Sequence, residues 1–250
     1  LGDVYKRQIY GYETIGIAKS KDEMDQHLAS LPNGGQNALG TNWDAGDIMY
    51  KDLNGDGKID NGGNKYDDMG DMKKIGNNTP RYLFGLDLNA DYKGFDFRAF
   101  FQGVMKRDYW QGSAYFWGAT SLWHSTGFVE HADYFRAEAS NDLPANLNAY
   151  YPRPVFDSSK NRQKQTAYLQ SAAYIRLKNV QLGYTLPANL THKFYVSKLR
   201  IFVSGENLWT GTSLANMFDP ETIGGGDDTD KNGNAYPLSK TISFGISVTL

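Results

Sequence analysis

The chain has 250 residues, a formal net charge of −2 and no cysteine. No segment is rich in lysine or arginine, which argues against nucleic acid as a partner, and the lack of cysteine excludes thiolate metal sites, disulfides and cysteine nucleophiles. No run of 18 apolar residues is present, so a helical membrane span is excluded, whereas a membrane β-barrel spreads its apolar residues over alternate positions.

The first 80 residues are predicted to hold little regular structure. Residues 1–8, LGDVYKRQ, resemble translated sequencing-adapter sequence and are interpreted as a non-native end, with an ordinary strand end as the alternative. Residues 9–80 are expected to form an extracellular loop region. Within it a helix is predicted over 20–31, because Ser20 and Glu23 match a capping box and a Pro-Asn-Gly-Gly segment follows.

An Asp-rich segment after this helix matches the first nine positions of a calcium-binding loop. Its predicted ligands are the side chains of Asp52, Asn54, Asp56 and Asp60 and the backbone carbonyl of Lys58. The twelfth position, where a carboxylate is expected, is Gly63, and Asp67 or Asp68 is predicted to take its place. The segment 52–68 is therefore a predicted structural calcium site, with a solvated turn as the alternative.

Five segments alternate apolar and polar residues, which is the period-two pattern of a strand whose faces meet different solvents. They are residues 81–92, 95–105, 172–185, 198–208 and 239–250. Each is long enough to cover the roughly 9–11 residues that a tilted strand needs to cross a bilayer. The alternation breaks near Lys178 and Asn179, which predicts a β-bulge.

The connections between these strands alternate in length. Those after residues 92 and 185 are short, whereas those before 81, after 105 and after 208 are long. Outer-membrane barrels keep short turns on the periplasmic side and long loops outside. Because five strands cannot close a membrane barrel, the predicted fold is all-β, with these strands forming part of a large transmembrane antiparallel β-barrel that carries long extracellular loops.

The long loop after residue 105 is rich in aromatic residues, among them Trp110, Tyr115, Trp117 and Trp123. Flat aromatic rings stack on sugar rings, so these four are candidate substrate contacts; an aromatic girdle at the membrane interface and packing within the loop are the alternatives. The sequence contains no nucleophile elbow, zinc-protease motif or phosphate-binding glycine loop. We therefore expect that the protein is not an enzyme.

Several sequence blocks resemble the carboxy-terminal part of SusC/RagA-type TonB-linked outer-membrane transporters of Bacteroidetes. The blocks are GDI at residues 46–48 followed by YKDLNGDGKID from Tyr50, IGNNTPRYLFGLDLNADYKGFDFRAFFQG from Ile75, YIRLKNVQLGYTLP from Tyr174, LRIFVSGENLWT from Leu199, and the final YPLSKTISFGISVTL. Together they cover most of residues 9–250.

The resemblance implies a barrel of about 22 strands in outer-membrane lipid, with the plug domain and the other strands outside this sequence. It further implies a SusD-like lipoprotein partner, energy coupling through the TonB complex and import of glycans or peptides, while the calcium loop would stiffen the extracellular face. The main alternative is a secreted or surface β-sandwich that binds carbohydrate and is stabilised by calcium, since sandwiches also use alternating strands. A calcium-dependent glycan hydrolase is a third interpretation.

Overall fold

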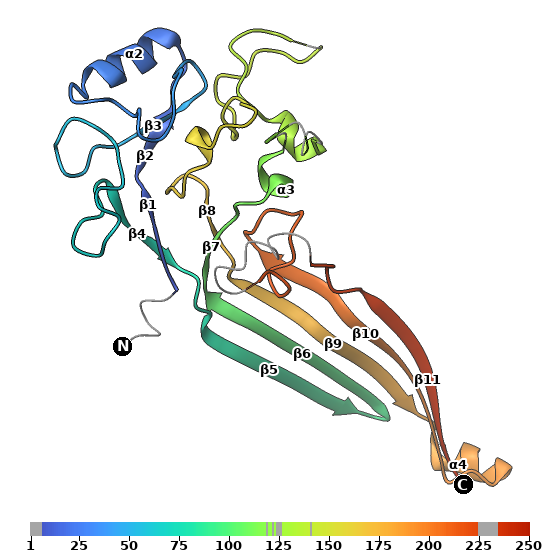
Figure 1. Ribbon diagram of the computed structural model, residues 1–250. Coiled ribbons are helices and arrows are strands. Elements are labelled where there is room, and N and C mark those ends of the chain that lie inside the picture. Colours follow the sequence, from blue (N-terminus) through green and yellow to red (C-terminus); the bar gives the residue numbers. More distant parts are fainter. Residues whose placement is uncertain (1–6, 119, 122, 124–126, 141, 225–234) are drawn as a thin grey trace. The chain divides into compact units, whose positions relative to one another are not determined.

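A computed structural model describes residues 7–118, 120–121, 123, 127–140, 142–224 and 235–250 (Figure 1). Most of the predicted non-native end, residues 1–6, lies outside the described residues. The chain divides into two compact units: unit 1 comprises Leu1–Asn78, Tyr109–Gln170 and Gly225–Asn234, and unit 2 comprises Thr79–Asp108, Ser171–Gly224 and Ala235–Leu250. None of the described helices combines the length and the apolar composition that crossing a bilayer requires.

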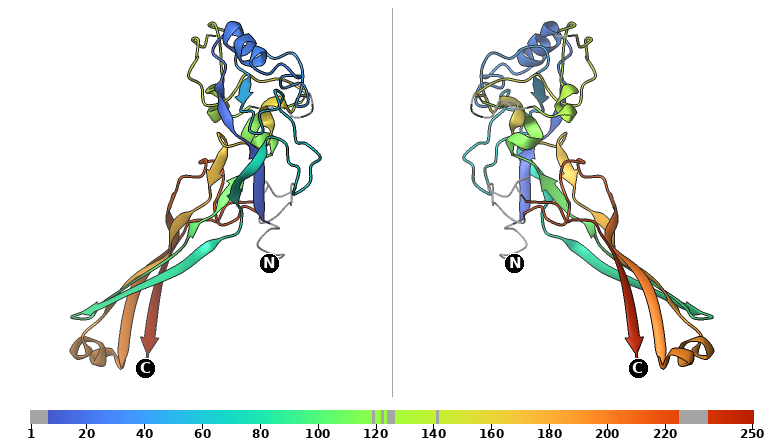
Figure 2. Two further views of the ribbon diagram at one scale, coloured as in Figure 1. Left: turned by 90° about the vertical axis from the view of Figure 1, so that its left-hand side faces the viewer. Right: turned by 90° about the vertical axis from the view of Figure 1, so that its right-hand side faces the viewer.

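In its described residues, unit 2 is built on an antiparallel five-stranded sheet in the order β11-β10-β9-β6-β5. The strands are β5 (Arg81–Tyr92), β6 (Phe95–Lys106), β9 (Tyr174–Thr185), β10 (Lys198–Thr212) and β11 (Thr241–Thr249). They match the five predicted strands to within two residues at each end, except that β10 runs four residues further. The long strands lie side by side and twist together (Figure 2). Among the described residues this sheet is not closed, because β5 and β11 are its edges.

Local backbone chemistry sets the connections of the sheet. The β5–β6 hairpin turns at Lys93 and Gly94, whose φ angles of 48° and 86° are both positive, as a type I′ turn requires. The connection from β9 to β10 contains the short helices α4 (Ala188–Thr191) and η3 (His192–Phe194). The predicted bulge is confirmed, since the register skips Lys178 in the pairing of β9 with both of its neighbours.

The register gives the sheet two chemically different faces. One cross-strand row consists of Ala90, Phe97, Leu182, Val203 and Phe244; the next row, on the opposite face, consists of Asn89, Arg98, Gln181, Ser204 and Ser243. Phe244 is 84% exposed. The polar face carries ion pairs between Arg98 and Asp87 and between Arg200 and Asp96. The sheet therefore displays large apolar side chains on one exposed face and charged pairs on the other.

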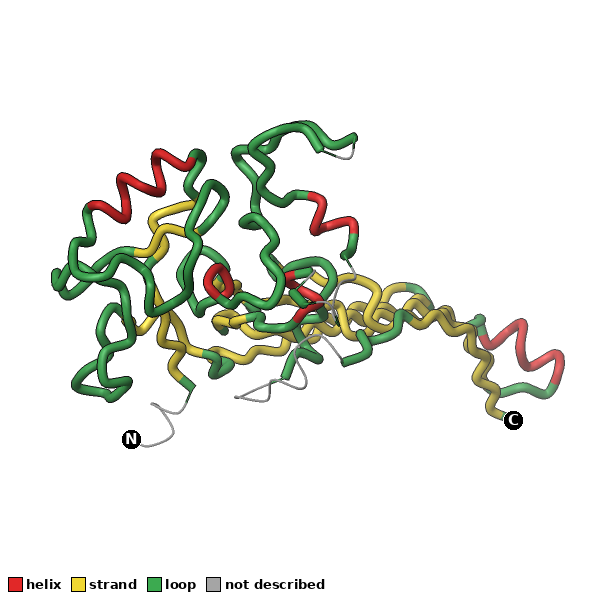
Figure 3. Tube along the Cα trace, turned by 45° about the horizontal axis from the view of Figure 1, so that its top comes forward, coloured by secondary structure: helices red, strands yellow, loops and turns green. Residues whose placement is uncertain are grey.

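Unit 1 consists mainly of loops with short strands (Figure 3). Strand β1 (Gln8–Tyr12) pairs with β4 (Met72–Asn77), and β2 (Thr14–Ile17) pairs with β3 (Ile48–Tyr50). These strands correct the prediction of a loop region over 9–80, and at three to six residues they are too short to show a clear period. Gln8 pairs with Asn77 in β1, which places at least this residue of the predicted non-native end in an ordinary strand.

The predicted helix over 20–31 is present as α2 (Lys21–Ala29). The Ser20 hydroxyl accepts a hydrogen bond from the backbone N–H of Glu23 at 3.1 Å, and the Glu23 carboxylate accepts one from the N–H of Lys19 at 2.6 Å. In an ordinary capping box this carboxylate accepts from the N–H of the N-cap residue, which is Ser20 here. In this helix it accepts from the residue before the N-cap instead. Further short elements are β7 (Asp108–Trp110), α3 (Ala114–Trp117), η1 (Val129–Ala132), η2 (Lys160–Arg162) and β8 (Leu169–Ser171).

Candidate functional site

The Asp-rich loop of unit 1 is wound by its own side chains. Asp52 accepts hydrogen bonds from the N–H groups of Gly55 and Gly57, at 2.6 and 2.9 Å. Asn54 accepts one from the N–H of Asp56 at 3.0 Å, and Asp56 accepts one from the N–H two residues further on, at 3.1 Å. Asp and Asn favour such turns because their short side chains reach the backbone ahead of them. The result is a compact loop with several oxygen atoms close together.

The carboxylate that completes this loop is Asp71. Oxygen atoms of Asp52, Asp56 and Asp71 lie within 4.8 Å of one another. Asp71 is fully buried and accepts hydrogen bonds from the N–H groups of Leu53 and Asp60, at 2.8 and 2.9 Å. Burial raises its pKa, and the nearby charge of Asp52 adds to the effect. Oxygen ligands at 2.3–2.6 Å from a calcium ion lie at most about 5 Å apart, so the three carboxylates fit one cation.

The other predicted carboxylate ligands, Asp60, Asp67 and Asp68, are not members of this group of three. Asp60 pairs with the ammonium group of Lys58 at 2.5 Å and accepts a hydrogen bond from the N–H of Gly62. Asp67 and Asp68 are exposed, and Asp68 accepts a hydrogen bond from Gly63 at 2.8 Å. The third carboxylate of the group is instead Asp71, eleven residues after Asp60, where no fixed motif spacing points to it. That Asp67 or Asp68 takes the twelfth position stays a prediction.

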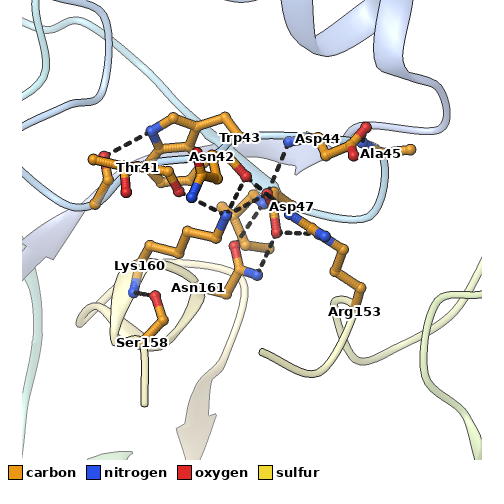
Figure 4. Close-up of polar contacts among 12 residues, drawn as sticks. Thr41, Asn42, Trp43, Asp44, Ala45, Asp47, Arg153, Ser158, Lys160 and Asn161 are labelled. Atoms are coloured by element: carbon orange, nitrogen blue, oxygen red, sulfur yellow. Dashed lines mark hydrogen bonds and ion pairs between the residues drawn. The ribbon is translucent and has the colours of Figure 1, made fainter. Parts of the chain in front are cut away.

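A buried ion cluster centred on Asp47 joins distant parts of unit 1 (Figure 4). Arg153 donates to both carboxylate oxygens of Asp47 at 2.8 Å, and the Lys160 ammonium group and the Asn161 amide donate at the same distance. Lys160 is 2% exposed, and it also donates to the carbonyl oxygens of Thr41 and Asn42. Its ammonium group lies 5.0 Å from the ring centre of Trp43.

The positive charges of Arg153 and Lys160 compensate the negative charge of the buried Asp47 carboxylate. Burial alone would raise the pKa of Asp47, but the hydrogen bonds from Arg153, Lys160 and Asn161 outweigh it and lower the pKa. The backbone beside Asp47 is equally constrained, because Gly46 has a φ of 85° and a side chain there would meet the Phe135 ring at 2.4 Å. Sequence reasoning missed this cluster, since its partners are more than 100 residues from Asp47.

Two of the four predicted substrate-contacting aromatics pack inside unit 1. The rings of Trp110 and Trp117 lie 5.9 Å apart, and Trp117 lies 4.8 Å from Tyr168. The neighbouring rings are Phe116, Tyr150 and Tyr151. Burial raises the pKa of Tyr168 well above its usual value. The alternative of packing within the loop therefore describes Trp110 and Trp117.

The other two predicted aromatics are accessible. Tyr115 is 47% exposed and stacks on Phe128 at 6.1 Å, and Trp123 is 93% exposed. The neighbours of Trp123 at 122 and 124–126 lie outside the described residues. Tyr115 and Trp123 are thus the more accessible pair, and composition alone could not distinguish them from Trp110 and Trp117.

A cavity of about 420 Å³ opens beside the aromatic cluster. Its lining includes Trp117, Phe128, Tyr134, Tyr151, the prolines at 152 and 154, and the cationic residues Arg153, Lys160 and Arg162. His131 also lines it: the ring accepts a hydrogen bond from the N–H of Phe128 at its Nδ1, 2.9 Å away, and its Nε2 lies 3.0 Å from the carbonyl oxygen of Phe116. The cavity is suited to a small ligand with both an apolar face and a negative charge.

Comparison with known proteins finds relatives that match nearly the whole length of the chain. No family model matches it. It is 28% identical over 246 residues to TonB-dependent receptor P3 of Formosa agariphila and 27% identical over 252 residues to TonB-dependent receptor P26 of the same organism. Each match covers 96% of this chain and 22% of the relative. The chain therefore spans about a fifth of the length of these curated relatives.

Solved structures give the same result for the fold. A structure of the RagAB peptide transporter matches 98% of this chain and 23% of its own, with a TM-score of 0.60 and 22% identity. The RagAB peptide importer in a closed-closed state matches with a TM-score of 0.57 and 20% identity. The resemblance predicted from the sequence blocks is confirmed by these two kinds of match.

Proposed function

Because this chain resembles SusC/RagA-type TonB-linked transporters along nearly its whole length, we propose that it forms part of an outer-membrane importer. The long strands of unit 2 are part of the barrel wall, and unit 1 belongs to the extracellular loops. The observation that carries the proposal is the exposed apolar face of the five-stranded sheet. Lipid is the solvent that this face suits, since large apolar side chains such as Phe244 stay exposed on it.

The dimensions of the sheet support a membrane position. On β6 the apolar face runs from Phe95 to Met105, which is ten residue steps, or about 33 Å at about 3.3 Å per residue. A tilt of about 40° reduces this length to about 25 Å, which is the height of the apolar band of outer-membrane barrels. Phe95 and Tyr184 pack at 4.6 Å at one end of this face, where an aromatic girdle would lie.

The remaining parts of the proposal concern the whole importer. The free edges of β5 and β11 call for neighbouring strands in lipid, and a barrel of about 22 strands supplies them. We propose that a SusD-like lipoprotein covers the importer and that the TonB complex energises it. The cargo is a glycan or a peptide, and this chain supplies wall and loops rather than a catalytic group.

We also propose that the Asp-rich loop binds structural calcium. Asp52, Asp56 and Asp71 are the carboxylate ligands, and the cation offsets the burial and the smaller repulsion from Asp52 that together raise the pKa of Asp71. The ion would tie the loop around Asp52 to Asp71, next to the β1–β4 pair. In this position calcium stiffens the extracellular loops.

Cysteine labelling tests the membrane position, because the chain has no cysteine of its own. We expect Ile246→Cys, on the apolar face, to resist a water-soluble maleimide in isolated outer membranes, and Ser204→Cys, on the polar face, to react. Recovery of the full-length protein in the outer-membrane fraction is the accompanying measurement. Equal reactivity of both positions, or a soluble protein, would overturn the proposal.

Calorimetry with calcium chloride tests the metal site. Asp71→Asn is expected to weaken calcium binding by about tenfold or more, because affinity depends on the number of charged ligands. Asp68→Asn, in the same loop but outside the carboxylate cluster, is the matched control and should bind as the parent does. The claim fails if calcium does not bind at millimolar concentration, or if Asp68→Asn weakens calcium binding and Asp71→Asn does not.

The β-sandwich alternative receives no support. A sandwich needs a second sheet packed on the first and polar outer faces. In the described residues, unit 2 holds a single sheet whose apolar face is exposed. The glycan hydrolase interpretation likewise has no observation in its favour.

A further inference from the structure

The cavity of unit 1 combines aromatic walls with an unusual balance of charge. Trp117, Phe128 and Tyr151 supply flat surfaces. Three cationic residues line it, and none of its described lining residues is acidic. Its volume of about 420 Å³ falls within the roughly 300–1,000 Å³ of small-molecule sites.

One of the three cations is free to take an anion. Arg153 and Lys160 are already paired with Asp47. Arg162 is different, because its Nε and Nη2 atoms both donate to the carbonyl oxygen of Ser158, at 3.1 and 2.8 Å. Among the described carboxylates none forms a direct ion pair with it, and the carboxylate of Asp157 acts on its charge only from beyond ion-pair distance. A guanidinium group has five N–H donors, so Arg162 keeps donors for a ligand.

The surroundings favour a sugar over a peptide. None of the lining residues belongs to a named β-strand; they come from loops, from α3 and from the η1 and η2 helices. The cavity therefore offers no strand edge along which an extended peptide could add main-chain hydrogen bonds. Aromatic walls suit the apolar face of a pyranose ring, and a guanidinium group matches a carboxylate in geometry.

We propose that this cavity binds a carboxylated sugar ring of the hexuronate type, with Arg162 holding the carboxylate and Trp117 and Phe128 flanking the ring. The cargo of the importer would accordingly include acidic polysaccharide fragments. This last step rests on the proposed import function, whereas binding itself does not depend on transport.

Isothermal titration of the full-length protein in detergent tests the proposal with three ligands. Trigalacturonate is expected to bind, and to bind more weakly as salt is raised. Galactotriose, which has the same rings without carboxylates, should bind at least about tenfold more weakly, because hydrogen bonds to charged groups are the stronger ones. Equal binding of both sugars, failure of trigalacturonate to bind, or tighter binding of triglutamate would overturn it.

Two substitutions locate the binding site. Arg162→Gln keeps a donor for the Ser158 carbonyl but removes the charge, and it should weaken trigalacturonate binding by about tenfold or more. Lys164→Gln removes the same charge two residues away, at an exposed position outside the cavity, and should change nothing. Equal losses in both variants would mean unspecific attraction and contradict the proposal. Failure of the labelling test for membrane position would leave this titration unaffected, so the two proposals can fail separately.

Discussion

The apolar face of the sheet in unit 2 and the ion cluster of unit 1 place polar and apolar groups in opposite ways. Unit 2 keeps Phe244 84% exposed, whereas unit 1 buries Lys160 at 2% and Asp47 completely. The sheet depends on backbone ladders and, in the proposed membrane position, on an apolar solvent outside it. Unit 1 depends on specific polar pairs, each of which becomes costly when one partner is lost. Single substitutions should therefore damage the two units by different mechanisms.

Deleting a residue of β9 should produce the largest effect. Removal of Gln181 shifts the strand register by one and moves every side chain on one side of it to the wrong face, so we expect the protein to fail to assemble in membranes. Removal of Lys178, which the pairing already skips, should leave the faces intact. Heat-modifiable migration in gel electrophoresis reports assembly, and equal failure of both deletions would argue against the bulge.

Asp47→Asn should be the most damaging single substitution in unit 1. It leaves the buried Lys160 without its counter-ion, which costs about 3–5 kcal/mol. Hydrogen exchange in segments 41–48 and 153–161 should accelerate by roughly a hundredfold or more, at about 1.4 kcal/mol per factor of ten, while β9 and β10 remain protected. Asp22→Asn, on exposed helix α2, is the control. Unchanged exchange in both segments would show that the cluster does not hold them together.

The same cluster should give unit 1 a pH dependence. The pKa of Asp47 is lower in the folded chain than in the unfolded chain, where it lies near about 3.9. Its stabilising contribution is therefore complete above about pH 4 and is lost as the pH falls through the lower, folded-state value. Exchange measured from pH 6 downwards should show this loss in the parent protein, and it should be absent from Asp47→Asn.

Lysine scanning on β11 should separate the two faces of the sheet. Ile242→Lys puts a charge on the apolar face in a central row, at a cost of about 2–4 kcal/mol if that face meets lipid. Ser243→Lys, the next residue on the polar face, should cost less than about 1 kcal/mol. Folding in lipid vesicles at increasing urea concentration gives both values, and similar costs would mean that both faces meet water.

The smallest effect is expected at the start of α2. Ser20→Ala removes the hydroxyl that accepts from Glu23, and loss of such a cap costs about 1 kcal/mol. Exchange of the first helical amides should increase several-fold, and Ser30→Ala, at the other end of the helix, should leave those amides unchanged. The sheet of unit 2 should not respond to either change.

The elements that could be predicted are those with local signals. Alternation places the long strands, the Ser20 and Glu23 pattern places α2, and the break at Lys178 places the bulge. Strands β2 and β3, with four and three residues, are too short for alternation to be distinguished from chance. Two of the three clustered carboxylates could be predicted for the same reason, because Asp52 and Asp56 follow a motif.

The remaining site residues could not be predicted, because their contacts leave no local pattern in the sequence. Asp71 reaches the loop through an insertion without fixed spacing, and Asp47 meets partners over 100 residues away. The aromatic loop illustrates another difficulty, because a half-buried Trp117 and an exposed Trp123 have the same composition signal. Arg162 matches no sequence motif, and its proposed role follows from its place in the lining of the cavity.

The separation between Asp47 and its partners also sets an order of events during folding. The partners of Asp47 lie 106 to 114 residues downstream; they are Arg153, Lys160 and Asn161. The ribosome therefore synthesises the whole β5–β6 hairpin after Asp47 and before these partners. The hairpin closes over two residues at little cost in loop entropy, whereas the Asp47 cluster closes a loop of more than 100 residues. Unit 1 should therefore become ordered late, and a newly made chain carries an uncompensated carboxylate at Asp47 until its last cationic partner has arrived.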